Sequence, residues 1–326
     1  MRRTRWLALA GTLGVAFAVA LAWEPALEAQ ELLAPLSVRS TLPAWRAPGG
    51  RLAVQGSAGP GEIVRLLVGA RAIDAVTTGP GGGFSLLGRV PRSSGRYAVA
   101  VVLARDPVER VSLGTLRVRA LRLAAVGDVN LGDRVGLAIG AFGTRYPWSD
   151  VAPTLRRADI AVANLECAVS TRGAPVPKQY TFRGSPASLR AVASYAGIDV
   201  LSVANNHSLD FGRLAFADTL RHAHEYGMRT IGGGSNLDAA RRPAVIRVGG
   251  LKVALLGFSD VRPLGFDAGP STSGTTPAFP AYVATDVRAA RRRADVVVAY
   301  FHWGVERALT PTARQRSLAT AALDAG

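Results

Sequence analysis

Apolar and polar positions alternate in two different rhythms along the chain, which predicts two regions of different structure. Between residues 31 and 120, short apolar stretches are separated by turns rich in glycine and proline. The stretches with strand character are 51–55, 63–68, 84–87, 97–103 and 115–118. Several short strands at this spacing, with turn residues between them, favour a small all-β sandwich in this region.

From about residue 121 the rhythm changes, and the apolar runs are continuous. They comprise residues 123–126, 160–163, 200–204, 253–257 and 296–301. Unbroken runs of this kind predict strands that are buried on both faces of a sheet. Two amphipathic helical stripes lie between them, one from Ser185 to Gly197 and one ending at Gly227. Strands that alternate with helices predict a mixed α/β domain over residues 121–326.

Residues 1–30 have the pattern of an export signal. Three arginines lie among the first five residues, residues 6–22 carry no charge, and Ala20-Leu21-Ala22 offers a cleavage site. The uncharged run also approaches the minimum length of a bilayer span, so a cleaved signal peptide and an uncleaved signal anchor are both open. In either case we expect the rest of the chain to be exported and to be secreted or membrane-anchored at the cell surface.

The charge of the chain favours anionic partners other than nucleic acid. The formal net charge is +16, from 39 lysines and arginines against 23 acidic residues. The excess is spread over both regions, with +7 in residues 31–120 and +8 in residues 121–326, and the longest basic run has three arginines. Because the charge forms no basic cluster, we expect no nucleic-acid partner and favour an acidic polymer or the cell envelope.

Candidate chemistry lies at the carboxyl ends of the predicted α/β strands, where such sheets place their ligands. The polar residues there are Asp128, Asn130, Asn164, Glu166, Asn206, His207, Asp210, Asp260, His302 and Glu306. Carboxylate and amide oxygens combined with imidazole suit Mn²⁺, Mg²⁺, Fe²⁺ or Zn²⁺. Two such ions can clamp a phosphoryl group and activate water, so the pattern predicts a metal site.

These motifs in combination resemble the signature series of the CapA (PgsA) capsule-synthesis family, which belongs to the calcineurin-like metallophosphoesterase superfamily. The motifs are Gly127-Asp128, Asn164-Leu165-Glu166, Lys178-x-Tyr180-x-Phe182-Arg183, Asn205-Asn206-His207-x-x-Asp210 and His302-Trp303-Gly304-x-Glu306. The resemblance implies a layered α/β/β/α metallophosphatase-like domain over residues 121–326. Residues 31–120 loosely resemble bacterial immunoglobulin-like (Ig-like) modules, which makes the preceding sandwich Ig-like.

The resemblance also implies roles for particular residues. Asp128 would hold a first metal, Glu166 would bridge two metals, and Asn206 and His302 would hold the second. Asn130 stands where the superfamily has a histidine, so it would ligate only through a weak amide oxygen. Asn164 and Glu306 are expected to support these ligands. The expected cofactor is therefore a pair of divalent ions in a full-length chain.

Four further residues complete the expected site. His207 would give a proton to the leaving group, the usual role of a general acid, and Asp210 would orient it. Lys178 and Arg183 would bind an anionic substrate, although a solvated loop is an equal alternative for both. Asp210 and Glu306 also have the alternative of being helix caps or surface carboxylates.

We expect the chain to end before the last metal ligands. The final predicted helix stops at Gly326, and another strand should follow it in an alternating α/β domain. In the family that the chain resembles, that strand leads to a Gly-His-x-Pro-His type motif. A C-terminally truncated chain of this kind would lack one or two ligands of a two-metal site.

The resemblance implies a role in making or exporting poly-γ-glutamate or a related capsule polymer. The expected partners are the anionic polymer or a phosphoester substrate, together with membrane-bound synthase or export subunits. One alternative is a metal-dependent phosphoesterase of the cell envelope that is unrelated to capsule. A second is a non-catalytic scaffold that binds the polymer. Asn130 in place of histidine favours the scaffold, whereas the Asn206-His207 pair favours chemistry.

Overall fold

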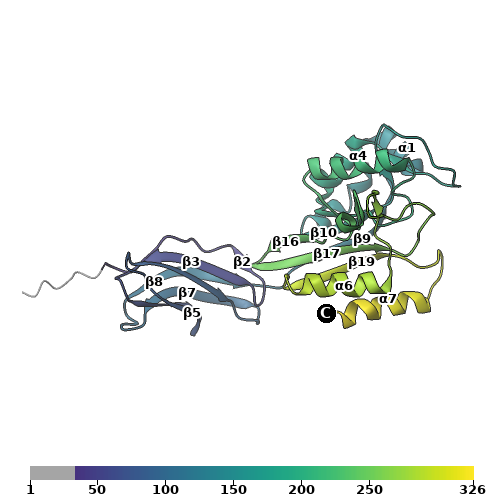
Figure 1. Ribbon diagram of the computed structural model, residues 1–326. Coiled ribbons are helices and arrows are strands. Elements are labelled where there is room, and N and C mark those ends of the chain that lie inside the picture. Colours follow the sequence, from purple (N-terminus) through teal and green to yellow (C-terminus); the bar gives the residue numbers. More distant parts are fainter. Residues whose placement is uncertain (1–33) are drawn as a thin grey trace, which may run out of the picture.

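The computed structural model describes residues 34–326, which form two adjoining regions, one all-β and one mixed α/β (Figure 1). The predicted export signal at residues 1–30 lies outside the described residues. Within residues 34–326, no helix combines the length and the apolar character needed to cross a bilayer.

Residues 37–118 form two sheets that face each other. Their strands are β1 (Ser37–Val38), β2 (Trp45–Arg46), β3 (Arg51–Ser57), β4 (Ile63–Val68), β5 (Arg71–Thr77), β6 (Gly83–Arg89), β7 (Gly95–Leu103) and β8 (Arg110–Val118). One sheet has the order β1-β3-β6 and the other the order β2-β8-β7-β4-β5. Alternate side chains point into a shared apolar core, including Val54 and Leu86 from the first sheet and Leu66 and Val101 from the second. The five strands predicted here are confirmed as β3, β4, β6, β7 and β8, and β1, β2 and β5 are additional.

The second region alternates strands and helices, as its apolar runs predicted. Its main strands are β9 (Leu123–Val129), β10 (Ile160–Leu165), β13 (Val200–Ser202), β14 (Arg229–Ile231), β16 (Ala244–Val248), β17 (Leu251–Ser259) and β19 (Val296–His302). Its short strands are β11 (Ala168–Val169), β12 (Arg183–Gly184), β15 (Gly233–Gly234) and β18 (Gly274–Thr275). Its helices and turns are α1 (Asp133–Phe142), η1 (Tyr146–Trp148), α2 (Ala152–Leu155), α3 (Pro186–Ala191), the π-turn η2 (Val192–Ala196), α4 (Gly212–Glu225), α5 (Leu237–Ala240), α6 (Pro280–Arg291) and α7 (Ala313–Asp324).

These elements stack as helices, sheet, sheet and helices (Figure 1). The first sheet is parallel with the order β14-β13-β10-β9, and the second has the order β16-β17-β19. Strand β10 is buried on both faces: Val162 packs against the second sheet, while Ala163 packs toward α1, α3 and α4. Helices α6 and α7 cover the outer face of the second sheet. This confirms the mixed α/β fold.

The prediction that every apolar run is buried on both faces is wrong for two strands. In β10 and β13 every residue is buried, but residues 123–126 of β9 alternate between exposed and half-buried positions and β19 is nowhere fully buried. Both strands lie at the edge of their sheet. An edge strand has a neighbour on one side only, so an apolar sequence alone does not ensure its burial.

The two predicted helical stripes are confirmed in detail. The first begins at Ser185, whose hydroxyl accepts a hydrogen bond from the Ser188 amide, and ends at Gly197 with a left-handed φ of 80°. It is not one uniform helix, because η2 inserts a π-turn between α3 and Gly197. The second stripe forms α4 and is followed by Gly227 at φ 84°.

The two regions are docked through backbone hydrogen bonds and an arginine. The turn between β16 and β17 reaches the all-β region, where the Ala47 amide donates to the Gly249 carbonyl (2.7 Å) and the Arg51 amide to the Gly250 carbonyl (2.8 Å). Arg119 makes two hydrogen bonds of 2.7 Å to the Asp159 carboxylate. These contacts hold the regions in a defined orientation.

Replacing Gly50 with alanine is expected to lower stability by about 1–3 kcal/mol, because it overpacks this junction. A Cβ at Gly50 would lie 2.3 Å from the Gly249 carbonyl oxygen and 2.9 Å from that of Ala47. Thermal unfolding measures the effect. Gly81→Ala is the matched control, since a Cβ there would meet no atom within 4 Å. Equal unfolding midpoints for the two variants would contradict the close docking.

Candidate metal centre

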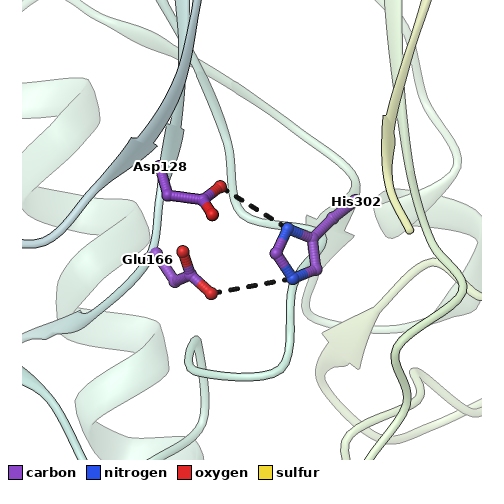
Figure 2. A group of neighbouring side chains, drawn as sticks. All are labelled: Asp128, Glu166 and His302. Carbon is purple, nitrogen blue, oxygen red and sulfur yellow. Dashed lines mark ion pairs between the residues drawn. The ribbon is translucent and has the colours of Figure 1, made fainter. Parts of the chain in front are cut away.

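Three elements bring Asp128, Glu166 and His302 together at the carboxyl ends of their strands. Asp128 lies in β9, Glu166 directly follows β10, and His302 is the last residue of β19. Each offers one ligand atom, and these atoms lie within 4.8 Å of one another. The His302 ring faces both carboxylates, with its Nδ1 3.6 Å from Asp128 Oδ1 and its Nε2 3.6 Å from Glu166 Oε1 (Figure 2). The group therefore joins the two sheets at one edge.

Three asparagines position this group. Asn164 Nδ2 donates to Asp128 Oδ1 (2.8 Å) and lies 3.3 Å from His302 Nδ1. Asn206 Oδ1 lies 2.7 Å from His302 Nε2, so its amide oxygen is next to the imidazole. Asn205 is fully buried and donates from Nδ2 to Asn164 Oδ1 (2.9 Å) and to the Leu165 carbonyl (2.8 Å). Asn205 thus fixes Asn164, a role that the sequence did not reveal.

The electrostatics of the group favour a cation between the carboxylates. Burial, together with the neighbouring Asp128 carboxylate, raises the pKa of Glu166 from 4.5 to about 8. The neighbouring His302 imidazole holds the pKa of Asp128 well below its ordinary value. The Asp128 side chain is 55 % exposed, so the group opens to solvent on that side. Carboxylate and amide oxygens with one imidazole fit a divalent ion of the Mn²⁺ or Zn²⁺ type.

A second polar cluster surrounds His207. Asp210 is fully buried and accepts hydrogen bonds from His207 Nδ1 (2.7 Å), Lys178 Nζ (2.6 Å) and the Phe182 amide (2.7 Å). The Phe182 ring stacks on the His207 ring with 4.2 Å between centroids. Since the bond to Asp210 takes the proton of Nδ1, the other ring nitrogen, Nε2, is left without a hydrogen bond to any of residues 34–326.

The two basic residues expected to bind substrate make internal contacts. Lys178 lies between Asp210 and His207, and its ammonium also donates to the Asn206 carbonyl. Arg183 donates to the carbonyls of Arg172 (3.1 Å) and Gly173 (2.8 Å), and it stacks on the Phe211 ring at 3.6 Å. Their positive charges therefore support loops in this structure, and a role in substrate binding stays a prediction.

Two other expected site residues lie apart from the metal-binding group. The side-chain oxygen of Asn130 accepts a hydrogen bond from the Gly132 amide (2.8 Å), which closes a local turn after β9. Glu306 is exposed in the segment after β19, and no hydrogen bond or ion pair within the described part of the chain joins it to His302. Asn164 and Asn206, not Glu306, contact the imidazole.

Comparison with known proteins places this region in a family. The family model "Bacterial capsule synthesis protein PGA_cap" matches residues 122–326. The chain is 32 % identical over 209 residues to the PGA biosynthesis protein CapA of Bacillus subtilis, which covers 63 % of this chain and 55 % of that protein. It is 30 % identical over 214 residues to the capsule biosynthesis protein CapA of Bacillus anthracis, covering 63 % and 52 % respectively.

Solved structures are more distant. The fibronectin(III)-like modules of Clostridium thermocellum CbhA share 14 % identity over 29 % of this chain and 56 % of that chain, with a TM-score of 0.21. The chain spans about half the length of the curated relatives that it matches. The family match includes both sheets of the α/β region and the three residues of the candidate metal centre. The chain therefore belongs to the family of bacterial capsule synthesis proteins described as PGA_cap.

Proposed function

We propose that the protein acts in the synthesis or export of poly-γ-glutamate or a related anionic capsule polymer, using a metal-dependent centre of the metallophosphoesterase type. The observation that carries this proposal is the convergence of Asp128, Glu166 and His302 from two sheets. The helix–sheet–sheet–helix order supports a metallophosphatase-like fold. The names of the relatives in Bacillus species support a capsule polymer as the biological target.

Asp128, Glu166 and His302 would hold a divalent ion, with the amide oxygen of Asn206 as a further donor. When bound there, such an ion would polarise a phosphoryl oxygen and lower the pKa of bound water. Asp210 holds the Nδ1 proton of His207, so the ring, when it carries a second proton at Nε2, would give that proton to the leaving oxygen. Lys178 balances the charge of the buried Asp210 carboxylate and so keeps the His207 ring in place.

The proposal also assigns the remaining parts of the chain. Residues 1–30 would direct export, cleaved or retained as an anchor, and residues 31–120 would form an Ig-like module outside the membrane. Membrane-bound synthase or export subunits would be the protein partners. The two facing sheets around one apolar core support the Ig-like assignment.

One observation favours a second candidate, a non-catalytic scaffold that binds the polymer. The amide oxygen of Asn130 binds the Gly132 amide, so the position that resembles a metal histidine makes a turn contact. A chain that holds one ion weakly would keep the fold and lose phosphoester hydrolysis.

Replacing His207 with alanine separates the two candidates. With Mn²⁺ present, the enzyme should hydrolyse bis(p-nitrophenyl) phosphate, and His207→Ala should lower kcat by about 100-fold or more because the proton donor is lost. His224→Ala is the matched control, since His224 is exposed on α4. Both variants should bind Mn²⁺ like the wild type. Bound Mn²⁺ without turnover by the wild type would favour the scaffold.

A further inference from the structure

A groove with a volume of about 1040 Å³ lies at the junction of the two regions. The residues that line it include Arg71, Arg89, Arg92, Arg291, Asp295 and Val296. The groove reaches the first residue of β19, whereas His302 is the last residue of that strand. At about 3.3 Å per residue, these positions are about 20 Å apart, so the groove is separate from the candidate metal centre.

The groove carries a local excess of positive charge. Four arginines line it against one carboxylate, that of Asp295. Arg89 pairs with Asp295 at 2.8 Å and donates to the Gly49 carbonyl at 2.9 Å. The guanidinium groups of Arg71, Arg92 and Arg291 are on exposed residues, and within residues 34–326 none of the three has a carboxylate oxygen within 4 Å. Arg291 also donates to the Ala294 carbonyl (3.3 Å), which leaves its charge, like those of Arg71 and Arg92, without a carboxylate partner in the described residues.

The walls of the groove come from both regions and are held in register. The all-β region contributes Arg71, Arg89 and Arg92, and the α/β region contributes Arg291 and Asp295. The Arg89–Asp295 ion pair spans the junction, as do the backbone hydrogen bonds at the turn between β16 and β17. A preformed groove loses less conformational entropy on binding than a flexible one.

We propose that this groove binds a segment of a polycarboxylate chain and holds the polymer about 20 Å from the metal centre. The proposal rests on the proposed function, because it takes the polymer from there. Guanidinium groups bind carboxylates through paired N–H donors, and separated arginines match a chain of repeated carboxylates. Once one carboxylate of a polymer chain is bound, the next is held close to a second arginine at a high effective concentration, so several weak contacts together raise the affinity for the chain.

The apolar part of the lining fits this polymer better than a nucleic acid. Val90, Pro91, Leu251 and Val296 lie among the arginines and can pack against the methylene groups of a polyglutamate backbone. No aromatic side chain is among the residues that line the groove. Single-stranded nucleic acids are bound largely by stacking bases on aromatic rings, which this groove does not offer.

The test replaces Arg71, Arg92 and Arg291 together with glutamine and measures binding of fluorescein-labelled poly-γ-glutamate by anisotropy. The matched control replaces Arg65, Arg110 and Arg134 with glutamine, because these arginines are also exposed and lie outside the groove. The net charge changes by the same amount in both variants. At about 50 mM salt we expect the groove variant to bind about tenfold more weakly and the control like the wild type.

The possible outcomes separate this inference from the proposed function. If both variants bind poly-γ-glutamate equally more weakly than the wild type, the groove proposal is overturned, because net charge alone would then explain binding. Tighter binding of a 20-nucleotide oligothymidylate than of poly-γ-glutamate would overturn the polycarboxylate assignment. Mn²⁺ binding is measured in parallel. If the wild type fails to bind the polymer while the groove variant still binds Mn²⁺, the groove proposal is refuted and the metal centre stands. Polymer binding by a protein that does not bind Mn²⁺ would support the groove proposal and refute the metal centre.

Discussion

Replacing His302 with alanine is expected to weaken Mn²⁺ binding by about 100-fold or more. His302 supplies the one imidazole of the candidate centre, and it joins β19 to the Asp128 and Glu166 carboxylates of the other sheet. Removing it also leaves Asn206 Oδ1 and Asn164 Nδ2 without their contact to the ring. Isothermal titration calorimetry of the full chain with Mn²⁺ measures the loss directly.

Two further variants show whether this effect is specific to the centre. His224→Ala removes an exposed histidine of α4 and should leave Mn²⁺ affinity unchanged. Asn164→Ala removes a side chain that orients Asp128 and His302, and it should weaken binding by about tenfold. An unchanged affinity in His302→Ala would mean that the three side chains do not hold the ion.

The fold could be predicted from the sequence wherever a segment shows the hydrophobic periodicity of a strand or a helix and ends at a turn residue. Strands such as β4 alternate strictly between exposed and buried residues near their start, and the stripe of α4 ends at a glycine. Strand β5 was missed because Asp74 and Arg71 interrupt its apolar character. The two-residue turn with Gly69 at φ 63° between β4 and β5 is the signal that could have revealed the hairpin.

The candidate site was predictable only in part. The ends of strands can be located from the sequence, whereas the path of a loop between them cannot. The positions of Asp128, Glu166 and His302 follow from the parallel order of their strands. The internal use of Lys178 depends on a long loop that returns to Asp210, and no local pattern encodes that return. The sequence places Asn205 in a motif but does not reveal its role, since that role is to contact a neighbouring strand.

Replacing Glu166 with glutamine is expected to stabilise the metal-free protein at pH 8 and above while abolishing tight Mn²⁺ binding. The pKa of Glu166 is about 8 in the folded protein, above its ordinary value of 4.5. The folded state therefore holds this proton more tightly than the unfolded state. The resulting stability is complete below pH 4.5 and is lost as the pH rises from 4.5 to 8. Glutamine has no proton to lose and stays neutral beside the Asp128 carboxylate.

The expected change in the free energy of unfolding of Glu166→Gln is large and has a defined sign, so it tests whether the two carboxylates repel each other. The variant should exceed the wild type by about 3–5 kcal/mol in free energy of unfolding above pH 8, with the difference shrinking toward pH 4.5. Saturating Mn²⁺ should reverse the order, because the ion stabilises only the protein that binds it. Chemical denaturation at several pH values, with and without Mn²⁺, measures both effects. Glu306→Gln, at an exposed carboxylate, is the control and should change neither. A destabilised metal-free Glu166→Gln would mean that Glu166 is not held under charge repulsion, and the case for a cation between the two carboxylates would fail with it.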